Sequence, residues 1–166
     1  MPPRLVSFGI ALGVFVVDRF TKWMIERFMT MWDTRVVIPG FFQIIHTENR
    51  GAAFSLLANS SDEVRNFVLV GLSLVVLAFI AVLLWNSESR LAREHAALRV
   101  GLALILGGAL GNIYDRVMRG AVTDFLDVYV GDAHWPTFNA ADCAISIGAG
   151  LMILSLWLGR REAVRT

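Results

Sequence analysis

Two aspartates, Asp124 and Asp142, are the residues of this sequence best suited to chemistry. Asp124 lies between apolar neighbours, and Asp142 lies at the start of a long apolar run. A carboxylate is costly inside a bilayer, so its position there needs a compensating role. Two carboxylates held close together cannot both ionise cheaply and therefore share a proton. One can activate water while the other polarises a carbonyl, which is the chemistry of an aspartic protease.

Membrane helices are the elements that must position this pair. Of the 166 residues, 56% are hydrophobic and 17% are charged, and the mean hydropathy is +0.61, which is more apolar than a soluble domain. Four apolar segments approach the ~20 residues that cross ~30 Å of hydrocarbon. They predict helices at about residues 5–23, 67–85, 96–114 and 140–158. We therefore expect one integral membrane domain, mainly α, with four transmembrane helices.

The distribution of arginine predicts the orientation of this domain. Four crossings put both termini on one side of the membrane. The segments 1–4, 86–99 and 159–166 are dense in arginine: Arg4, Arg90, Arg93, Arg99, Arg160, Arg161 and Arg165. By the positive-inside tendency, these segments are predicted to be cytoplasmic. The site then lies near the extracytoplasmic face, where the outer regions are about 24–66 and 115–139. No small-x-small cleavage motif follows the first apolar run, which predicts a retained helix rather than a signal peptide.

A small extracytoplasmic β-sheet is predicted after the first helix. Residues 36–38 and 41–47 are rich in β-branched and aromatic types and flank a Pro-Gly pair, a pattern typical of strand, turn and strand. Residues 121–130 have a similar composition and could join the sheet. The Ser-Ser-Asp-Glu sequence at 60–63 predicts a capped start of the second helix. The segment 49–66 could close over the site as a lid.

Further polar residues collect near the same outer boundary. Asp18 and Lys22 have i, i+4 spacing and opposite sign, which predicts an ion pair at the end of the first helix. Lys22 could also snorkel to a lipid headgroup or meet the substrate. Asn49 could bind a peptide backbone through its amide. Gly51 predicts a turn with a positive φ.

The third helix carries small and polar residues at helical spacing. Gly107 and Gly111 form a GxxxG pair, which permits close helix contact. Asn112 and Arg116 lie on one face together with Gly108 and are candidates for the functional site. The small residues on that face could give room to a substrate helix. We also expect the Asp142 carboxylate to have a partner in Asn139, Arg116 or Asp124.

The remaining titratable residues are assigned no catalytic role. Asp127 and Asp132 are predicted to be solvated loop charges, and Cys143 is predicted to be a buried, inert thiol. The three histidines, His46, His95 and His134, have no ligand spacing, so no metal and no cofactor are expected. His46 has no assignable role. A net charge of +1 without a basic patch gives no support to nucleic-acid binding.

Two other classes of function remain open from these residues alone. One is an ion or proton pathway that uses Asp18, Lys22, Asp124 and Asp142 as relay groups. Such a pathway needs ionisable residues through the depth of the bilayer, whereas these collect near one surface. The other is a purely structural membrane subunit, for which the outer polar cluster has no purpose.

The chain resembles the bacterial lipoprotein signal peptidases, also called signal peptidase II. Four blocks carry the resemblance: 18–22 (DRFTK), 49–54 (NRGAAF), 107–116 (GGALGNIYDR), and 122–125 (VTDF) followed by 138–142 (FNAAD). Each block is a weak signal alone, but four in order between four apolar segments are specific.

The resemblance implies a fold, an activity and a set of site residues. It implies a multi-pass protein of the bacterial inner membrane with four helices and a small extracytoplasmic sheet. The activity is metal-independent aspartic cleavage of diacylglyceryl-modified prolipoproteins immediately before the lipidated cysteine. Asp124 and Asp142 are implied as the catalytic pair, and Asp18 with Lys22 as a structural or lipid-facing pair. Supporting residues are implied at Asn49, Gly51, Asn112, Arg116 and Asn139. We expect a monomer that contacts membrane lipid and its prolipoprotein substrate.

Overall fold

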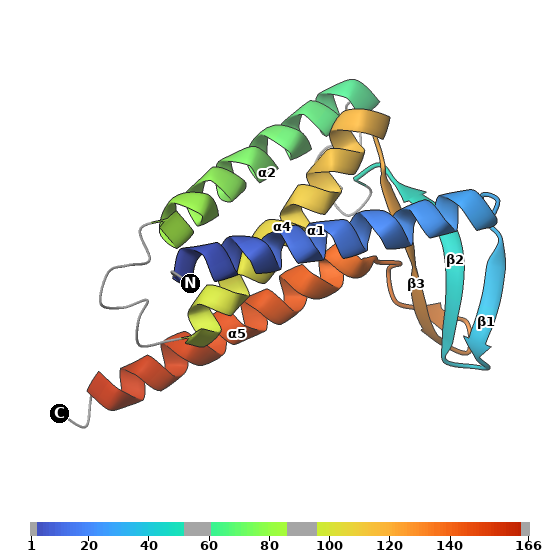
Figure 1. The fold of residues 1–166 in the computed structure, drawn as a ribbon. Helices are drawn as coiled ribbons and strands as arrows, with labels where there is room; N and C mark the ends of the chain where they lie inside the picture. The colour runs from blue at the N-terminus through green and yellow to red at the C-terminus, as the bar shows by residue number, and fades with distance from the viewer. Residues whose placement is uncertain (1–2, 52–60, 86–95, 164–166) are drawn as a thin grey trace.

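Four long helices and a small β-sheet make up the described part of the chain. The computed structural model describes residues 3–51, 61–85 and 96–163. In chain order the elements are α1 (Pro3–Phe28), β1 (Thr34–Ile38), β2 (Phe42–Asn49), α2 (Asp62–Trp85), α4 (Ala96–Arg119), β3 (Val122–Val130), β4 (Ala133–His134) and α5 (Ala140–Ala163). The helices form a bundle, and the sheet lies at one end of it (Figure 1). The predicted mainly helical fold with a small sheet is confirmed.

Three of the described helices are long and apolar enough to cross a membrane. These spans are Asn66–Trp85 in α2, Ala96–Arg119 in α4 and Ala140–Leu158 in α5. The charged residues Asp18, Arg19 and Lys22 interrupt the apolar sequence of α1, which is not among these spans. The count of four crossings therefore stays a prediction.

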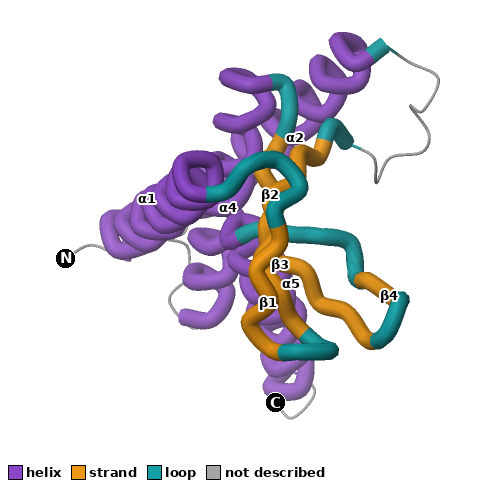
Figure 2. Tube along the Cα trace, turned by 90° about the vertical axis from the view of Figure 1, so that its right-hand side faces the viewer, coloured by secondary structure: helices purple, strands orange, loops and turns teal. Residues whose placement is uncertain are grey.

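The sheet has four antiparallel strands in the order β1-β2-β3-β4. Figure 2 views the molecule from the sheet end and shows the strands side by side. The predicted hairpin is present, and Gly40 in its turn has φ 77°. Residues 122–130 join it as β3, as the composition indicated. The pairing of β2 with β3 brings Thr47 opposite Asp124, so the sheet holds one of the two candidate aspartates.

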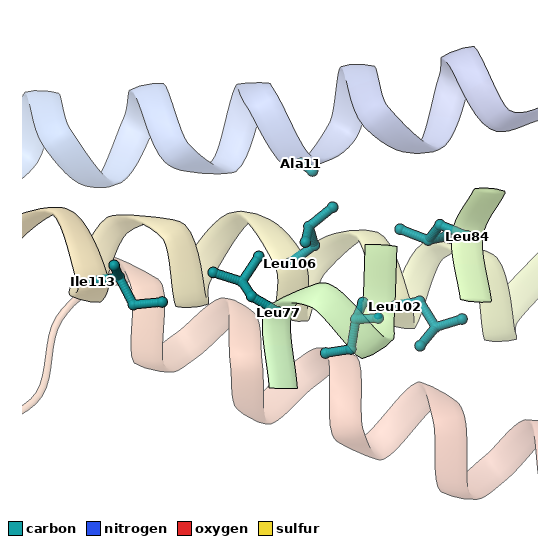
Figure 3. Packing of buried hydrophobic residues seen from close by; sticks show 7 residues of the cluster. Ala11, Leu77, Leu84, Leu102, Leu106 and Ile113 are labelled. Atoms are coloured by element: carbon teal, nitrogen blue, oxygen red, sulfur yellow. The ribbon is translucent and has the colours of Figure 1, made fainter. Parts of the chain in front are cut away.

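The apolar core lies between α1, α2 and α4. Its buried side chains include Ala11, Leu77, Leu84, Leu102, Leu106 and Ile113 (Figure 3). Helix α4 is central, because it packs against α1, α2 and α5. A side chain at Gly107 would collide with Ala11 of α1, and one at Gly108 would collide with Ala141 of α5. The expectation that these glycines leave room for a substrate helix is wrong, since other helices of the bundle fill that space.

Several element ends differ from the sequence-based expectation. Helix α1 continues to Phe28 and α4 to Arg119, five residues beyond each predicted end. Their last turns therefore lie beside the sheet instead of ending at the membrane boundary. Helix α2 begins at Asp62, and Ser61 Oγ accepts a hydrogen bond from Val64 N at 3.4 Å, which agrees with the predicted cap. Half of the expected lid, residues 52–60, and the loop 86–95 lie outside the described residues.

Candidate active site

Asp124 lies on β3 with its side chain directed into the protein. The residue is 1% exposed. Asn139 Nδ2 donates to Asp124 Oδ1 at 2.7 Å, and the Asn49 side chain also hydrogen-bonds this carboxylate. Thr47 Oγ1 on the neighbouring strand donates to the backbone oxygen of Asp124 at 3.1 Å. Both the side chain and the backbone of Asp124 are therefore fixed.

Asp142 lies in the first turn of α5 and accepts two hydrogen bonds. Asn112 Nδ2 of α4 donates to Asp142 Oδ1 at 2.8 Å, and the backbone N–H of Asn139 donates to Oδ2 at 3.2 Å. Asn139 caps the helix in return, because its Oδ1 accepts from the backbone N–H of Asp142 at 3.0 Å. Two N–H donors and the positive end of the helix dipole thus stabilise a negative charge on Asp142.

Asn139 connects the two carboxylates. Its side chain is completely buried. Besides its bond to Asp124, Nδ2 donates to Asn112 Oδ1 at 3.2 Å and to the backbone oxygen of Thr123 at 3.3 Å. One asparagine therefore contacts Asp124 through its amide and Asp142 through its backbone, which brings β3 and the start of α5 into one site.

The surroundings of Asp124 favour its protonated form. Burial, and after it the nearby charge of Asp142, raise the pKa of Asp124 from 3.8 to about 6. Hydrogen bonds from Asn49 and Asn139 and the charge of Lys22 oppose this rise in pKa without cancelling it. The site therefore places a carboxyl whose protonated form is favoured near a second carboxylate that accepts two N–H hydrogen bonds, an arrangement suited to acid–base hydrolysis.

A buried charge network lies directly behind Asn112. Asp18, Lys22 and Asp115 are all 0% exposed. Lys22 Nζ lies 2.9 Å from Asp18 Oδ2, 2.8 Å from Asp115 Oδ2 and 2.9 Å from Asn112 Oδ1. All three ammonium donors thus have partners inside the protein. The expected ion pair is present, but Lys22 neither snorkels nor faces lipid, because α4 covers it.

The same network holds α5 in place. Asp18 Oδ1 accepts a hydrogen bond from the backbone N–H of Ala141 at 3.0 Å, next to Asp142. Arg19, whose side chain is partly exposed, forms an ion pair with the buried Asp115. The sequence-based argument missed Asp115. Its position three residues after Asn112 puts it one helical turn further along α4, and this spacing was the signal that could have revealed it.

Gly51 and Arg116 support the site in different ways. Gly51 has the positive φ that was predicted, 91°, and its N–H donates to Asn49 Oδ1 at 2.8 Å. This contact fixes the Asn49 amide that meets Asp124. Arg116 is partly buried and interacts electrostatically with both Asp142 and Asp124. The structure thus brings all of the predicted site residues into one region.

Three expectations about the neighbouring residues need correction or completion. Asp127 is not a solvated loop charge, because it is 2% exposed, accepts from Gln43 Nε2 at 2.7 Å and lies 2.9 Å from His134 Nδ1. Asp132 is exposed, as predicted. Cys143 is only partly buried. His46 gains a structural role, since its Nδ1 lies 2.9 Å from the backbone oxygen of Met29.

An opening lies beside Asp142 along α5. This pocket, of about 440 Å³, is lined by Trp135, Phe138, Asp142, Cys143, Ser146 and Ile147. Its α5 residues follow the helix away from the sheet. An apolar segment could reach the Asp142 carboxylate along this path. Within residues 3–51, 61–85 and 96–163, no group of three or more His, Cys, Asp and Glu side chains could hold a metal ion.

Comparisons with known proteins agree on one family. The family model described as signal peptidase (SPase) II matches residues 10–158. The lipoprotein signal peptidase of Solibacter usitatus is 50% identical and covers 96% of this chain and 95% of that protein. The protein of the same name from Geobacter sulfurreducens is 44% identical over 93% of each chain. A bacterial membrane enzyme solved by the in meso method superposes with a TM-score of 0.75 at 30% identity, covering 92% of this chain and 87% of that one.

Proposed function

The chain belongs to the signal peptidase II family and removes signal peptides from prolipoproteins, and we propose that Asp124 and Asp142 are the acid and the base of this cleavage. One observation carries the proposal: in a buried site, Asn139 contacts both carboxylates. Family membership also decides against the ion-pathway and structural-subunit alternatives.

The two aspartates have different starting states in this proposal. Ionised Asp142 takes a proton from a water molecule while the water oxygen attacks the scissile carbonyl carbon. Protonated Asp124 donates a hydrogen bond to the carbonyl oxygen, where negative charge develops. When the C–N bond breaks, a proton passes to the leaving nitrogen. The assignment rests on the two N–H donors to Asp142 and on the pKa of about 6 at Asp124.

The substrate of this proposal is a prolipoprotein that already carries diacylglycerol on its cysteine, and the cut falls immediately before that cysteine. A signal peptide is an apolar helix, and a diacylglyceryl group anchors its cysteine in the bilayer, so both reach the enzyme by diffusion in the membrane plane. The opening beside Asp142, with Phe138 and Ile147 in its lining, supports entry from the lipid side.

The membrane arrangement is part of the proposal. We take α1 as the fourth crossing, because its charges Asp18 and Lys22 are buried against α4 and need not meet lipid. Both termini are then cytoplasmic and the sheet is extracytoplasmic, in the inner membrane of a bacterium. The enzyme acts as a monomer, because the two aspartates and the residues that hold them come from one chain.

The first experiment compares the purified wild type with Asp124→Asn and Asp142→Asn on a diacylglyceryl-modified prolipoprotein. Each near-isosteric change removes one carboxylate, so we expect cleavage to fall by at least about a thousandfold. Asp132→Asn is the matched control, because Asp132 is exposed, and it should cleave at the wild-type rate. Near-normal cleavage by either of the first two variants, in folded form, would rule out the paired-carboxylate mechanism.

A further inference from the structure

A second and larger opening lies on the sheet. This cleft, of about 630 Å³, is lined on one side by residues of β2, namely Gln43, Ile45, Thr47, Glu48 and Asn49. The segment 134–137 and Trp32 form its walls. Resting on the function proposed above, we propose that this cleft binds the stretch of substrate polypeptide that follows the scissile bond.

The cleft begins at the catalytic acid. Asn49 lines it and hydrogen-bonds the Asp124 carboxylate. Thr47, which also lines it, donates to the Asp124 backbone oxygen, and its hydroxyl lies 3.3 Å from Thr137 Oγ1 across the cleft. A polypeptide whose carbonyl meets Asp124 therefore has the cleft directly next to it.

The two openings match the two halves of the substrate. The pocket beside Asp142 follows the membrane helix α5 and suits the apolar signal peptide. The cleft is built by the sheet and suits the chain that leaves the membrane. Trp135 lines both openings, so they adjoin at this side chain, which suits a polypeptide that occupies both.

Trp32 supplies independent support. It is the only residue other than glycine with a positive φ in the described part of the chain, at 69°, a conformation that is unfavourable for a bulky side chain. Its N–H donates to the backbone oxygen of His46 at 2.8 Å, which holds the turn. The indole is 70% exposed and Trp135 is 69% exposed. Strain that holds a large aromatic residue in solvent at the rim of a cleft points to contact with a ligand.

The charges that line the cleft indicate which polypeptide segments it would bind. The lining contains the carboxylates of Glu48 and Asp127 and the imidazole of His134, and none of the described residues that line it is a lysine or arginine. An acidic segment is therefore disfavoured relative to a neutral or basic one. The backbone of β2 is already paired with β1 and β3, so side chains rather than added strand pairing must hold the ligand. Such contacts tolerate many neutral sequences.

The test uses two diacylglyceryl-modified substrates with the same signal peptide. The short one ends at the lipidated cysteine as an amide, and the long one continues with an extended neutral segment. We expect wild-type kcat/KM to be about tenfold higher for the long substrate, which corresponds to one well-buried aromatic contact.

Trp32→Ala should lower this ratio of the two kcat/KM values, long over short, toward one. Trp32→Gly, which relieves the positive φ, should do the same without lowering Tm. An acidic segment in the long substrate should also lower the ratio.

Trp85→Ala is the matched control, because this exposed tryptophan lies at the end of α2 far from the sheet (Figure 1). It should keep the wild-type ratio. Equal kcat/KM for both substrates in the wild type, or an unchanged ratio in both Trp32 variants, would overturn the inference. Failure of the proposed function has a different signature, since Asp124→Asn would then cleave both substrates at the wild-type rate.

Discussion

The orientation of one amide decides the chemistry of Asp142. Asn112 Oδ1 accepts from both Lys22 and Asn139, so the NH₂ group of Asn112 must face Asp142. Reversing the amide would place an oxygen against a carboxylate and leave one of the three N–H donors of Lys22 without an acceptor. Lys22 therefore acts on the proposed catalytic site through Asn112, although it does not touch either of the two aspartates proposed to react.

Replacing Lys22 by Met tests this role. The change leaves the buried carboxylate of Asp18 without its cation, and breaking a buried pair in this way costs about 3–5 kcal/mol. We expect a large fall in Tm in detergent and a lower kcat in the protein that remains folded. Arg27→Met, an exposed cation on the same helix, should change neither quantity. An unchanged Tm in the Lys22 variant would contradict the burial of the network.

The pKa of Asp124 makes stability depend on pH. Because its pKa is about 6 in the folded protein and 3.8 in the reference state, the folded protein binds more protons between these values. The contribution of Asp124 to the free energy of unfolding is therefore fully present below pH 4 and is lost as pH rises through 6. At about 1.4 kcal/mol per pKa unit, ionised Asp124 costs about 3 kcal/mol. We expect Asp124→Asn to be more stable than the wild type at pH 8, with a difference that shrinks toward pH 4.

Unfolding in denaturant at both pH values measures this difference. Asp132→Asn is again the control, and its stability relative to the wild type should not change with pH. A stability difference for Asp124→Asn that is equal at pH 4 and pH 8 would show that Asp124 does not titrate in this range.

At the scale of elements, α4 sets the position of every other helix. Its glycines let α1 and α5 approach so closely that the Asp18 and Asp142 carboxylates reach Ala141 and Asn112. A methyl group on this surface separates the helices by a fraction of an ångström, and hydrogen bonds near 2.8 Å weaken steeply with such a shift. We therefore expect a small separation of these helices to lower activity more than it lowers stability.

Gly108→Ala is the direct test. The new Cβ would lie 2.5 Å from the backbone oxygen of Ala141, beside Asp142. We expect the separation of α4 from α5 to lower kcat by about tenfold or more, because small displacements of catalytic groups are costly. Gly71→Ala on α2 meets no atom within 4 Å and should keep wild-type activity with equal or higher Tm. Full activity in the Gly108 variant would show that α5 need not pack so closely.

The elements themselves were largely predictable from the sequence. Apolar segments of membrane length gave the helices, and the Pro-Gly turn between β-branched runs gave the hairpin, because both signals are local. Burial of Asp115 and Asp127 was not predictable, since each is paired with residues far away in sequence, Arg19 and Gln43. Asp124 and Asp142 could be proposed as a pair from the sequence. The contacts by which Asn139 bridges them could be seen only in the folded structure.

At the scale of the whole molecule, the start of α1 and the end of α5 both lie at the end of the bundle opposite the sheet (Figure 1). The proposed topology puts this end in the cytoplasm. We expect an epitope tag after Thr166 to be digested by protease only in inverted vesicles. In a Cys143→Ser background, Thr34→Cys, exposed on β1, should react with an impermeant maleimide only from the outside. The opposite pattern would reverse the orientation.

The buried charges of α1 also bear on how the protein is made. Lys22 meets Asn112 across 90 positions of sequence, and Arg19 meets Asp115 across 96. During synthesis, α1 leaves the ribosome long before these partners exist, and a bilayer resists charged residues without partners. If α1 crosses the membrane as proposed, we expect the nascent helix to wait at the membrane surface or beside the insertion machinery. Its final insertion would then be a late step of biogenesis, completed only after α4 has been translated.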